Sequence, residues 1–336
     1  MTRLSLLFFS LWDATRRVPT RIINVKQTAV LSPIHNKNAN FAPVTVGTYT
    51  TCHMHTYYRS INVGGRLLDL SRPVVMGVVN ATPDSFYTGS RVAADGVEAR
   101  VRQMRLAGAA IIDVGACSTR PGSTPCSARE ETERLSWAVP AVLRAWPEAV
   151  VSVDTFRPEV ARMAVEQLGA HIINDVGDGP ADGLDQTVGT EVLTPMMAEA
   201  VRLGVPYILM SRARDAQQAL PWLSARVEAM RALGHRDIVI DPGFGFGRTP
   251  DDDLRLLSQL DRLQVLGLPV LVGMSRKRMA WQTLNISVEQ SLAATTVLNT
   301  LALERGADIL RVHDVAEAAQ AIELVCRVGR KCEGGE

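Results

Sequence analysis

The sequence predicts an α/β protein, specifically a single-domain (β/α)8 TIM barrel. Helical stretches end in glycine, each is followed by a short apolar run, and the pattern recurs along most of the chain. The runs are apolar on both faces, which is typical of parallel strands covered by helices. Eight runs at a spacing of about thirty-three residues favour a closed barrel. An open doubly wound sheet is the structural alternative.

The predicted strands are, in chain order, VVMGVVN (74–80), AAIIDVG (109–115), AVVSVDT (149–155), AHIIND (170–175), VPYILMS (205–211), DIVIDPG (237–243), LPVLVGMS (268–275) and ADILRVHD (307–314). Six of them follow a glycine that can cap the preceding helix: Gly108, Gly169, Gly204, Gly234, Gly267 and Gly306. The segments between strands have helical spacing, as in Leu254, Leu257 and Leu260. Pro158 stands where the first turn of a helix favours proline.

Composition excludes several classes of protein. The 336 residues are 46% hydrophobic, which is ordinary for a globular chain, and the net charge of +1 predicts neither nucleic acid nor a membrane surface as partner. The five cysteines, Cys52, Cys117, Cys126, Cys326 and Cys332, are odd in number, scattered and never in a C-x-x-C pair. This pattern predicts a reducing compartment, the cytoplasm, and argues against a disulfide framework or a zinc site.

Residues 1–60 differ from the rest, because basic residues outnumber a single acid, Asp13, and no period is sustained. The apolar run Leu4–Trp12 is too short to span a bilayer. An organelle transit peptide, a weak secretory signal and an upstream extension that never folds all remain open, and we favour the last, with translation beginning near Met54. We therefore expect a disordered extension over 1–60 and the barrel domain over 61–332.

Nearly every predicted strand ends in polar residues. They are Asn80, Asp113, Asp154, Asn174, Asp175, Ser211, Asp241, Ser275, Lys277, Arg311 and His313. Any one of them could be only a turn former or a helix cap. In a barrel, however, the carboxyl ends of all strands meet on one face, where active sites are found. The sequence therefore predicts one polar site built from the whole chain.

Three of these residues suit a flat neutral heterocycle. Asp154, Asn174 and Asp241 offer acceptors and one amide, and Lys277 adds a donor. Such a set can satisfy the N–H groups and the carbonyl of a buried ring. The alternative is an ion-pair network that only stabilises the barrel mouth.

Cationic residues follow the last two strands, where barrels of this class often hold phosphate. They are Arg276, Lys277, Arg311 and His313, although SRKRM could instead be a solvated basic edge. A ring pocket beside an anion pocket indicates a heterocycle that carries a phosphate or diphosphate. In DPGFGFGRT the glycines let the backbone approach a ligand, and Phe244 or Phe246 covers an apolar edge. A divalent ion would be held mainly by substrate oxygens.

Seven ordered motifs strongly resemble the dihydropteroate synthase family, the pterin-binding barrel enzymes of folate biosynthesis. They are MGVVNATPDSF, CSTRPGS, VSVDTFRPEVA, GAHIINDV, DPGFGFGRT, LVGMSRKRM and RVHDV, and they cover the chain from about Leu68 to Val328. The resemblance implies a transferase that joins (7,8-dihydropterin-6-yl)methyl diphosphate to 4-aminobenzoate, as a sulfonamide-sensitive homodimer.

The resemblance also implies residue roles. Asp154, Asn174, Asp241 and Lys277 would bind the pterin ring, and Arg311 would stack on it and reach the diphosphate. His313 and Asn80 would hold the diphosphate, Asn80 through Mg²⁺. Thr119, Arg120 and Pro121, with Ser275 and Lys277, would shape the 4-aminobenzoate site. Phe246 and Gly273 complete the predicted substrate-binding set, and Arg311, His313 and Lys277 are the predicted catalytic residues.

The chain departs from the family at a few positions, which bear on loop closure and sulfonamide affinity. Ala116 and Cys117 replace a glycine and a glutamate, Tyr87 to Ser90 replace the usual S-D-G-G, and Arg248 replaces a lysine. Two other functions stay open. One is a methyltetrahydrofolate:corrinoid methyltransferase, against which S-T-R-P-G and R-V-H-D argue. The other is a catalytically silent paralogue that acts as a binding or scaffold protein.

Overall fold

The computed structural model describes residues 59–81, 90–117, 125–177 and 192–329. All of these residues belong to one compact unit, Met54–Glu336. The predicted extension over 1–60 therefore lies, except for its last two residues, outside the described residues. The domain boundaries stay predictions.

The strands are β1 (Ser60–Val63), β2 (Arg66–Asp69), β3 (Val74–Asn80), β4 (Ala109–Gly115), β5 (Val150–Asp154), β6 (Ile172–Asp175), β7 (Tyr207–Met210), β8 (Ile238–Asp241), β9 (Leu271–Val272) and β10 (Ile309–Val312). The helices are α1 (Ser90–Leu106), α2 (Ala128–Ala145), α3 (Pro158–Glu166), α4 (Pro195–Leu203), α5 (Ala216–Ala232), α6 (Pro250–Ser258), α7 (Arg278–Trp281), α8 (Leu292–Glu304) and α9 (Val315–Val328), with short 3-10 helices η1 (Leu260–Leu266) and η2 (Glu289–Ser291).

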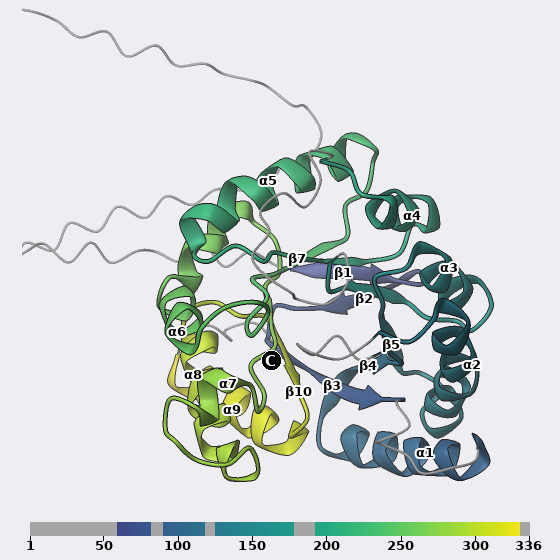
Figure 1. Ribbon diagram of the computed structural model, residues 1–336, viewed down its shortest axis with the longest axis horizontal. Coiled ribbons are helices and arrows are strands. Elements are labelled where there is room, and N and C mark those ends of the chain that lie inside the picture. Colours follow the sequence, from purple (N-terminus) through teal and green to yellow (C-terminus); the bar gives the residue numbers. More distant parts are fainter. Residues whose placement is uncertain (1–58, 82–89, 118–124, 178–191, 330–336) are drawn as a thin grey trace, which may run out of the picture. The chain divides into compact units, whose positions relative to one another are not determined.

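Strands β3 to β10 form one parallel sheet in the order β8-β7-β6-β5-β4-β3-β10-β9. A bridge between Ile240 and Val270 links the two outer strands, so the sheet nearly closes on itself. Helices follow the strands one by one and surround them (Figure 1). The predicted (β/α)8 barrel is confirmed, and the open sheet is excluded.

Local signals in the sequence explain this regularity. All six predicted capping glycines have positive φ, a backbone conformation in which other residues are strained. Helix α3 begins at Pro158, as its fixed φ favours. In the described part of the chain no helix combines the length and the apolar character needed to cross a membrane.

One end of the barrel interior is apolar and closed. Each of the eight strands gives it one buried residue: Met76, Ile111, Val150, Ile172, Ile208, Val239, Leu271 and Ile309. The antiparallel hairpin of β1 and β2 adds Ile61 and Val63 to this cluster. Asn62 N donates to Asp237 Oδ1 at 2.9 Å, just before β8, so the hairpin covers the amino-terminal end of the strands. Sequence analysis did not predict this hairpin.

Candidate active site

The polar side of the barrel follows from strand periodicity. Side chains alternate across a strand, so the residue two places beyond an interior residue faces the interior again. Asp113 therefore follows Ile111 into the barrel, Asn174 follows Ile172, and Arg311 follows Ile309. The same two-residue step leads from Val239 to Asp241 and from Leu271 to Gly273. Two such steps lead from Val150 through Ser152 to Asp154. The apolar layer is thus succeeded by a polar layer at the carboxyl ends.

Arg311 joins three of the strands at this level. Its Nε donates to Asp113 Oδ2 at 2.7 Å, and its Nη2 donates to Asp154 Oδ2 at 2.5 Å. Asn174 Nδ2 also donates to Asp113 Oδ2, at 3.1 Å. Asp113 is fully buried, and its Oδ1 has no hydrogen-bond partner among the described residues. Sequence analysis placed Asp113 at a strand end but gave it no role, whereas the structure puts it at the centre of the cluster.

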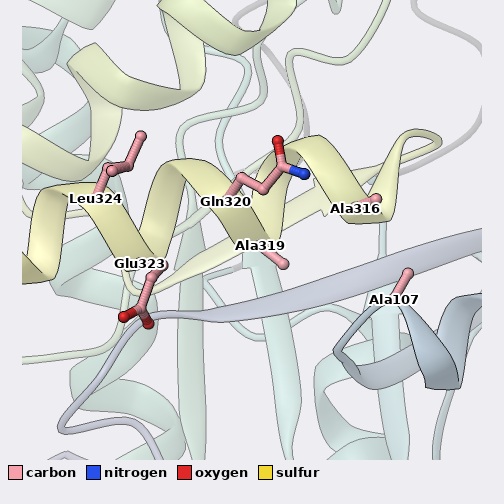
Figure 2. Close-up of a pocket in the computed structure, with 6 residues that line it drawn as sticks. All are labelled: Ala107, Ala316, Ala319, Gln320, Glu323 and Leu324. Atoms are coloured by element: carbon pink, nitrogen blue, oxygen red, sulfur yellow. The ribbon is translucent and has the colours of Figure 1, made fainter.

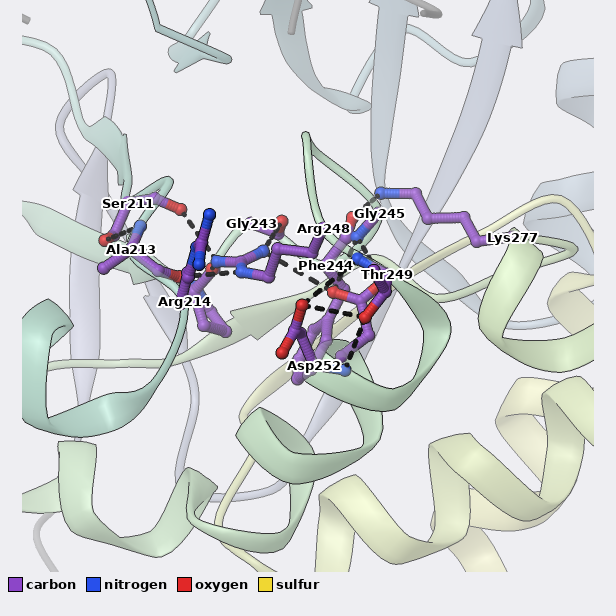
Figure 3. Close-up of polar contacts among 12 residues, drawn as sticks. Ser211, Ala213, Arg214, Gly243, Phe244, Gly245, Arg248, Thr249, Asp252 and Lys277 are labelled. Atoms are coloured by element: carbon purple, nitrogen blue, oxygen red, sulfur yellow. Dashed lines mark hydrogen bonds and ion pairs between the residues drawn. The ribbon is translucent and has the colours of Figure 1, made fainter. Parts of the chain in front are cut away.

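Lys277 and Asp241 occupy the other side of the mouth, beside the glycine-rich turn after β8. Asp241 Oδ1 accepts from Gly243 N at 2.7 Å. Lys277 Nζ donates to the Phe244 carbonyl (Figure 3) and lies 4.6 Å from the centroid of the Phe246 ring. The Phe244 side chain is buried in the core. Of the two phenylalanines, Phe246 is therefore the one whose ring lies beside Lys277.

The turn after β8 is held by Arg248. Its Nε donates to the Ala213 carbonyl at 2.7 Å, and its Nη1 donates to the Gly243 carbonyl (Figure 3). Its Nη2 donates to the Pro242 carbonyl. The side chain is fully buried, and Asp253 lies 3.6 Å away as its counter-charge. Arg248 thus fixes the backbone that carries the Lys277 acceptor, and it does not point at the polar layer as a free cation.

Ser275 and His313 meet at the ends of β9 and β10. Ser275 Oγ lies 3.1 Å from His313 Nδ1, and the same oxygen accepts from His313 N at 3.2 Å. A methyl group at Gly273 would lie 3.8 Å from Lys277 Nζ and 3.8 Å from Arg311 Cβ, so this glycine keeps space open between the two cations.

Arg276 is a correction to the predicted cationic group. Its guanidinium forms two hydrogen bonds with the Asp314 carboxylate, both of 2.9 Å, and its backbone has a φ of 54°. A two-pronged ion pair fixes the direction of the guanidinium toward Asp314. Lys277 and Arg311, by contrast, bond to residues of the polar layer and of its glycine-rich turn.

Burial shifts the titration of the cluster. Burial, with the neighbouring Asp113 carboxylate, raises the pKa of Asp154 to about 7, although Arg311 opposes the shift. Burial also raises the pKa of Asp241, against the attraction of Lys277. Burial lowers the pKa of Lys277 to about 8, with Arg311 adding to the effect and Asp241 opposing it. Such perturbed groups in one mouth are typical of a functional site.

Asn80 ends β3 next to Asp154. The two residues flank Gly115, where a Cβ would lie 3.8 Å from Asn80 Oδ1 and 3.7 Å from Asp154 Cβ. An amide oxygen is a hard donor that suits Mg²⁺. Among the described residues, the one cluster of three His, Cys, Asp or Glu ligands lies elsewhere, at Cys117, Cys126 and Glu131. Asn80 thus fits an ion that substrate oxygens would mainly hold.

Two features lie outside this cluster. The predicted 4-aminobenzoate residues Thr119, Arg120 and Pro121 fall outside the described residues. A groove of about 660 Å³ runs along α9, lined by Ala107, Ala316, Ala319, Gln320, Glu323 and Leu324 (Figure 2). None of the strand-end residues lines it, so this groove is not the polar site.

The comparisons with known proteins agree with the geometry. Residues 76–313 match the family described as pterin binding enzyme. The barrel fold, the polar layer at its mouth and the match to this family together define a pterin-binding enzyme of the (β/α)8 class. The chain is 36% identical over 278 residues to the dihydropteroate synthase of Escherichia coli strain K12, an alignment that covers 78% of this chain and 93% of that protein.

Solved structures give the same family. A Xanthomonas albilineans dihydropteroate synthase with 4-aminobenzoic acid superimposes with a TM-score of 0.71 at 36% identity, over 81% of this chain and 98% of that one. A Yersinia pestis dihydropteroate synthase with a sulfonamide drug complex gives 0.69 at 32% identity, over 80% and 99% of the two chains. The chain belongs to the dihydropteroate synthase family of pterin-binding enzymes.

Proposed function

We propose that the chain condenses (7,8-dihydropterin-6-yl)methyl diphosphate with 4-aminobenzoate to give 7,8-dihydropteroate and diphosphate. The observation that carries the proposal is the polar layer at the barrel mouth, where acceptors and two cations stand above a closed apolar layer. This arrangement can hold a flat ring and a charged leaving group side by side.

The pterin ring is bound by the acceptors of this layer. Asp154 and Asp241 accept from the ring N–H groups, while Asn174 both donates and accepts. Lys277 supplies a donor from the opposite side, and the Phe246 ring beside its ammonium shields the pocket. A buried ring needs a partner for each polar atom, and these four side chains provide them.

The diphosphate leaving group is bound by Arg311 and His313. Arg311 forms hydrogen bonds with Asp113 and Asp154. When substrate binds, its guanidinium can give up part of this bonding, stack on the ring and contact the leaving group. Departure of diphosphate leaves positive charge on the methylene carbon, which the ring delocalises. The arylamine attacks that carbon, so no strong base is required. Cations placed where charge develops on the leaving oxygens therefore stabilise the transition state.

Mg²⁺ is part of the proposal, with Asn80 as its protein ligand. When bound, the ion would neutralise charge on the leaving diphosphate. The 4-aminobenzoate site is assigned to Thr119, Arg120 and Pro121 together with Ser275 and Lys277. By analogy with the sulfonamide-bound relative, sulfonamides should compete there with 4-aminobenzoate.

One assay tests the proposed function against its rivals. The purified chain is incubated with the pterin diphosphate, 4-aminobenzoate and Mg²⁺, and dihydropteroate and diphosphate are followed. We expect both products in equal amounts and dependence on 4-aminobenzoate. A corrinoid methyltransferase would instead transfer the methyl group of methyltetrahydrofolate and release no diphosphate. A silent paralogue would form no product at high protein concentration, and either result would overturn the proposal.

We also propose that the chain forms a homodimer through α8 and α9, which pack against each other. Both helices expose apolar side chains four residues apart: Val297 and Leu301 are 57% and 39% exposed, and Leu324 and Val328 are 63% and 86% exposed. Exposed apolar pairs on neighbouring helices are typical of an interface. Sedimentation should give a dimer that Val297→Glu with Leu324→Glu converts to a monomer; a parent that sediments as a monomer overturns this.

A cytoplasmic location completes the proposal. Cys117 and Cys126 are free thiols in the structure, as a reducing compartment favours. Cell fractionation followed by immunodetection should find the chain with cytoplasmic markers.

A further inference from the structure

Two cysteines that are nine positions apart in the sequence lie together in the structure. The sulfur atoms of Cys117 and Cys126 and a carboxylate oxygen of Glu131 lie within 4.8 Å of one another. Cys126 N donates to Cys117 Sγ at 3.2 Å. The cysteines are scattered along the sequence, so sequence analysis expected no paired cysteines. The structure revises that expectation for Cys117 and Cys126. A disulfide needs an S–S distance of about 2.05 Å, so the two sulfur atoms must still approach each other for a bond to form.

The backbone on both sides of the pair is held in place. Arg134 Nη1 donates to the Ala116 carbonyl at 2.8 Å, next to Cys117. Arg157 Nη2 donates to the Cys126 carbonyl at 2.6 Å. Cys126 also directly precedes Ser127, the N-cap of α2. The two sulfur atoms therefore face each other across anchored backbone, which lowers the entropic cost of joining them.

The surroundings distinguish the two sulfur atoms. Burial lowers the pKa of the Arg157 guanidinium, but Glu131 and then the Cys117 sulfur raise it by more. The guanidinium therefore lies close to the Cys117 sulfur. Burial raises the pKa of the Cys126 thiol to about 12, with the Cys117 sulfur as the second cause. Cys126 is thus held as the thiol, and its backbone N–H already donates to the Cys117 sulfur. We therefore assign the attack on peroxide to Cys117 and the resolving step to Cys126.

We propose that Cys117 and Cys126 form a reversible disulfide, a redox-sensitive modification site beside the active site, in response to hydrogen peroxide. The Cys117 thiolate attacks one peroxide oxygen, the O–O bond breaks, and hydroxide leaves, to become water with a proton from solvent. This gives a sulfenic acid on Cys117. The Cys126 sulfur then attacks the Cys117 sulfur and displaces the second water, with the Cys126 proton passing by way of the Glu131 carboxylate. In total, two thiols and one peroxide give one disulfide and two waters.

The consequence for activity rests on the proposed function. The bond would close a ring of residues 117 to 126, and this ring contains Thr119, Arg120 and Pro121. The proposed function assigns these three residues to 4-aminobenzoate, so closing the ring should change the binding of that substrate. We expect the KM for 4-aminobenzoate to rise at least about threefold, the scale of the ordering cost of one side chain at a binding site. A thiol reductant restores the original value.

The test uses the full chain with Cys52→Ser, Cys326→Ser and Cys332→Ser, so that only the pair remains. After peroxide treatment the remaining thiols are alkylated and the digest is analysed by mass spectrometry. We expect a linked peptide containing Cys117 and Cys126, reversed by dithiothreitol. In Cys126→Ser, Cys117 should stop at a sulfenic acid that dimedone traps. In Cys117→Ser, Cys126 should remain unmodified.

Several outcomes would overturn this inference. If Cys117 and Cys126 can both still be alkylated after peroxide treatment, no disulfide has formed between them. A zinc ion bound at one per chain, which protects both thiols from peroxide, identifies a metal site instead. A disulfide that leaves the KM for 4-aminobenzoate unchanged removes the link to the active site. The mass spectrometric result does not depend on activity, so it separates failure of this inference from failure of the proposed function.

Discussion

At the scale of residues, Arg311 is the side chain on which the site most depends. It is paired with Asp113 and Asp154, and its side chain is only 18% exposed. Removing one partner of a buried ion pair leaves the other charge without compensation. Arg311 therefore balances two carboxylates at the barrel mouth, and in the proposed function it also supplies positive charge at the leaving group.

Arg311→Ala should lose at least about 2 kcal/mol of transition-state stabilisation, which is the range for one charge-stabilising group. The measurement is kcat/KM for the pterin diphosphate. Arg262→Ala serves as the control, because Arg262 is exposed on η1 and should leave the rate unchanged. Turnover of Arg311→Ala within about threefold of the parent would contradict the assignment.

The pH dependence of kcat/KM should be bell-shaped. Asp154, whose pKa burial raises to about 7, becomes an acceptor for ring N–H groups only as pH rises through that value. Lys277, whose pKa burial lowers to about 8, loses its charge above that value. We therefore expect a maximum between these two values, since profiles of kcat/KM report the free enzyme. In Lys277→Arg the alkaline limb should disappear, because guanidinium stays charged. Because the two limbs fall outside these values, a parent profile that stays flat from about pH 6 to about pH 9 would count against both roles.

The sequence predicted much of this site because strand ends converge in a barrel. Asp154, Asn174 and Arg311 were placed together correctly on that ground, and the structure links them through Asp113. The tasks of Asp113 and Arg276 could not be predicted, since they depend on which side chain pairs with which across the mouth. Asp314 next to His313 was the available signal for the Arg276 ion pair.

At the scale of elements, the turn after β8 is shaped by close backbone approach. Gly243 has a φ of 73°, and a Cβ there would lie 2.2 Å from the Ser211 carbonyl oxygen. Gly204, the cap of α4, has a φ of 65°, but a Cβ there would meet nothing within 4 Å. Both glycines thus adopt a left-handed backbone conformation with positive φ, but only Gly243 also lacks the space for a side chain.

Gly204→Ala should lower the free energy of unfolding by about 1–2 kcal/mol, which is the cost of a left-handed alanine. Gly243→Ala should lower it by more and should also reduce activity, because the turn carries the Lys277 acceptor. Urea denaturation of both variants checks this. Equal losses in the two variants would mean that the close approach to Ser211 does not constrain the turn.

The β1–β2 hairpin closes the barrel and lies at the end opposite the site. Ile61→Ala removes a buried side chain and should lower the free energy of unfolding by about 2–4 kcal/mol, with KM for both substrates unchanged. Leu67→Ala, at a position that is 70% exposed, should change it by less than about 0.5 kcal/mol. Similar losses in both variants, or a changed KM in Ile61→Ala, would contradict the role of the hairpin as a distant plug.

Sequence predicted the eight strands because six of them repeat the same helix, glycine cap and apolar run, and the other two are apolar runs of the same kind. Sequence analysis did not predict the hairpin, because its strands are short and border the basic segment, where no hydrophobic period is sustained. Its signal was the Gly64-Gly65 turn between Ile61 and Leu68, a pattern that favours hairpins.

At the scale of the whole molecule, closing the sheet makes one site from strand ends spread between Asn80 and His313. The apolar layer and the hairpin close one end of the barrel, and the polar layer forms at the other. In the proposed function, this polar layer is where the pterin diphosphate binds. The groove along α9, with its largely apolar lining, is a different surface.

A crystal structure of the chain with the pterin diphosphate and Mg²⁺ tests the central claim most directly. We predict the ring within hydrogen-bonding distance of Asp154, Asn174 and Asp241, with Lys277 at its edge and Arg311 between the ring and the diphosphate. A pterin seated outside the barrel mouth, or seated there without contact to these side chains, would contradict the account.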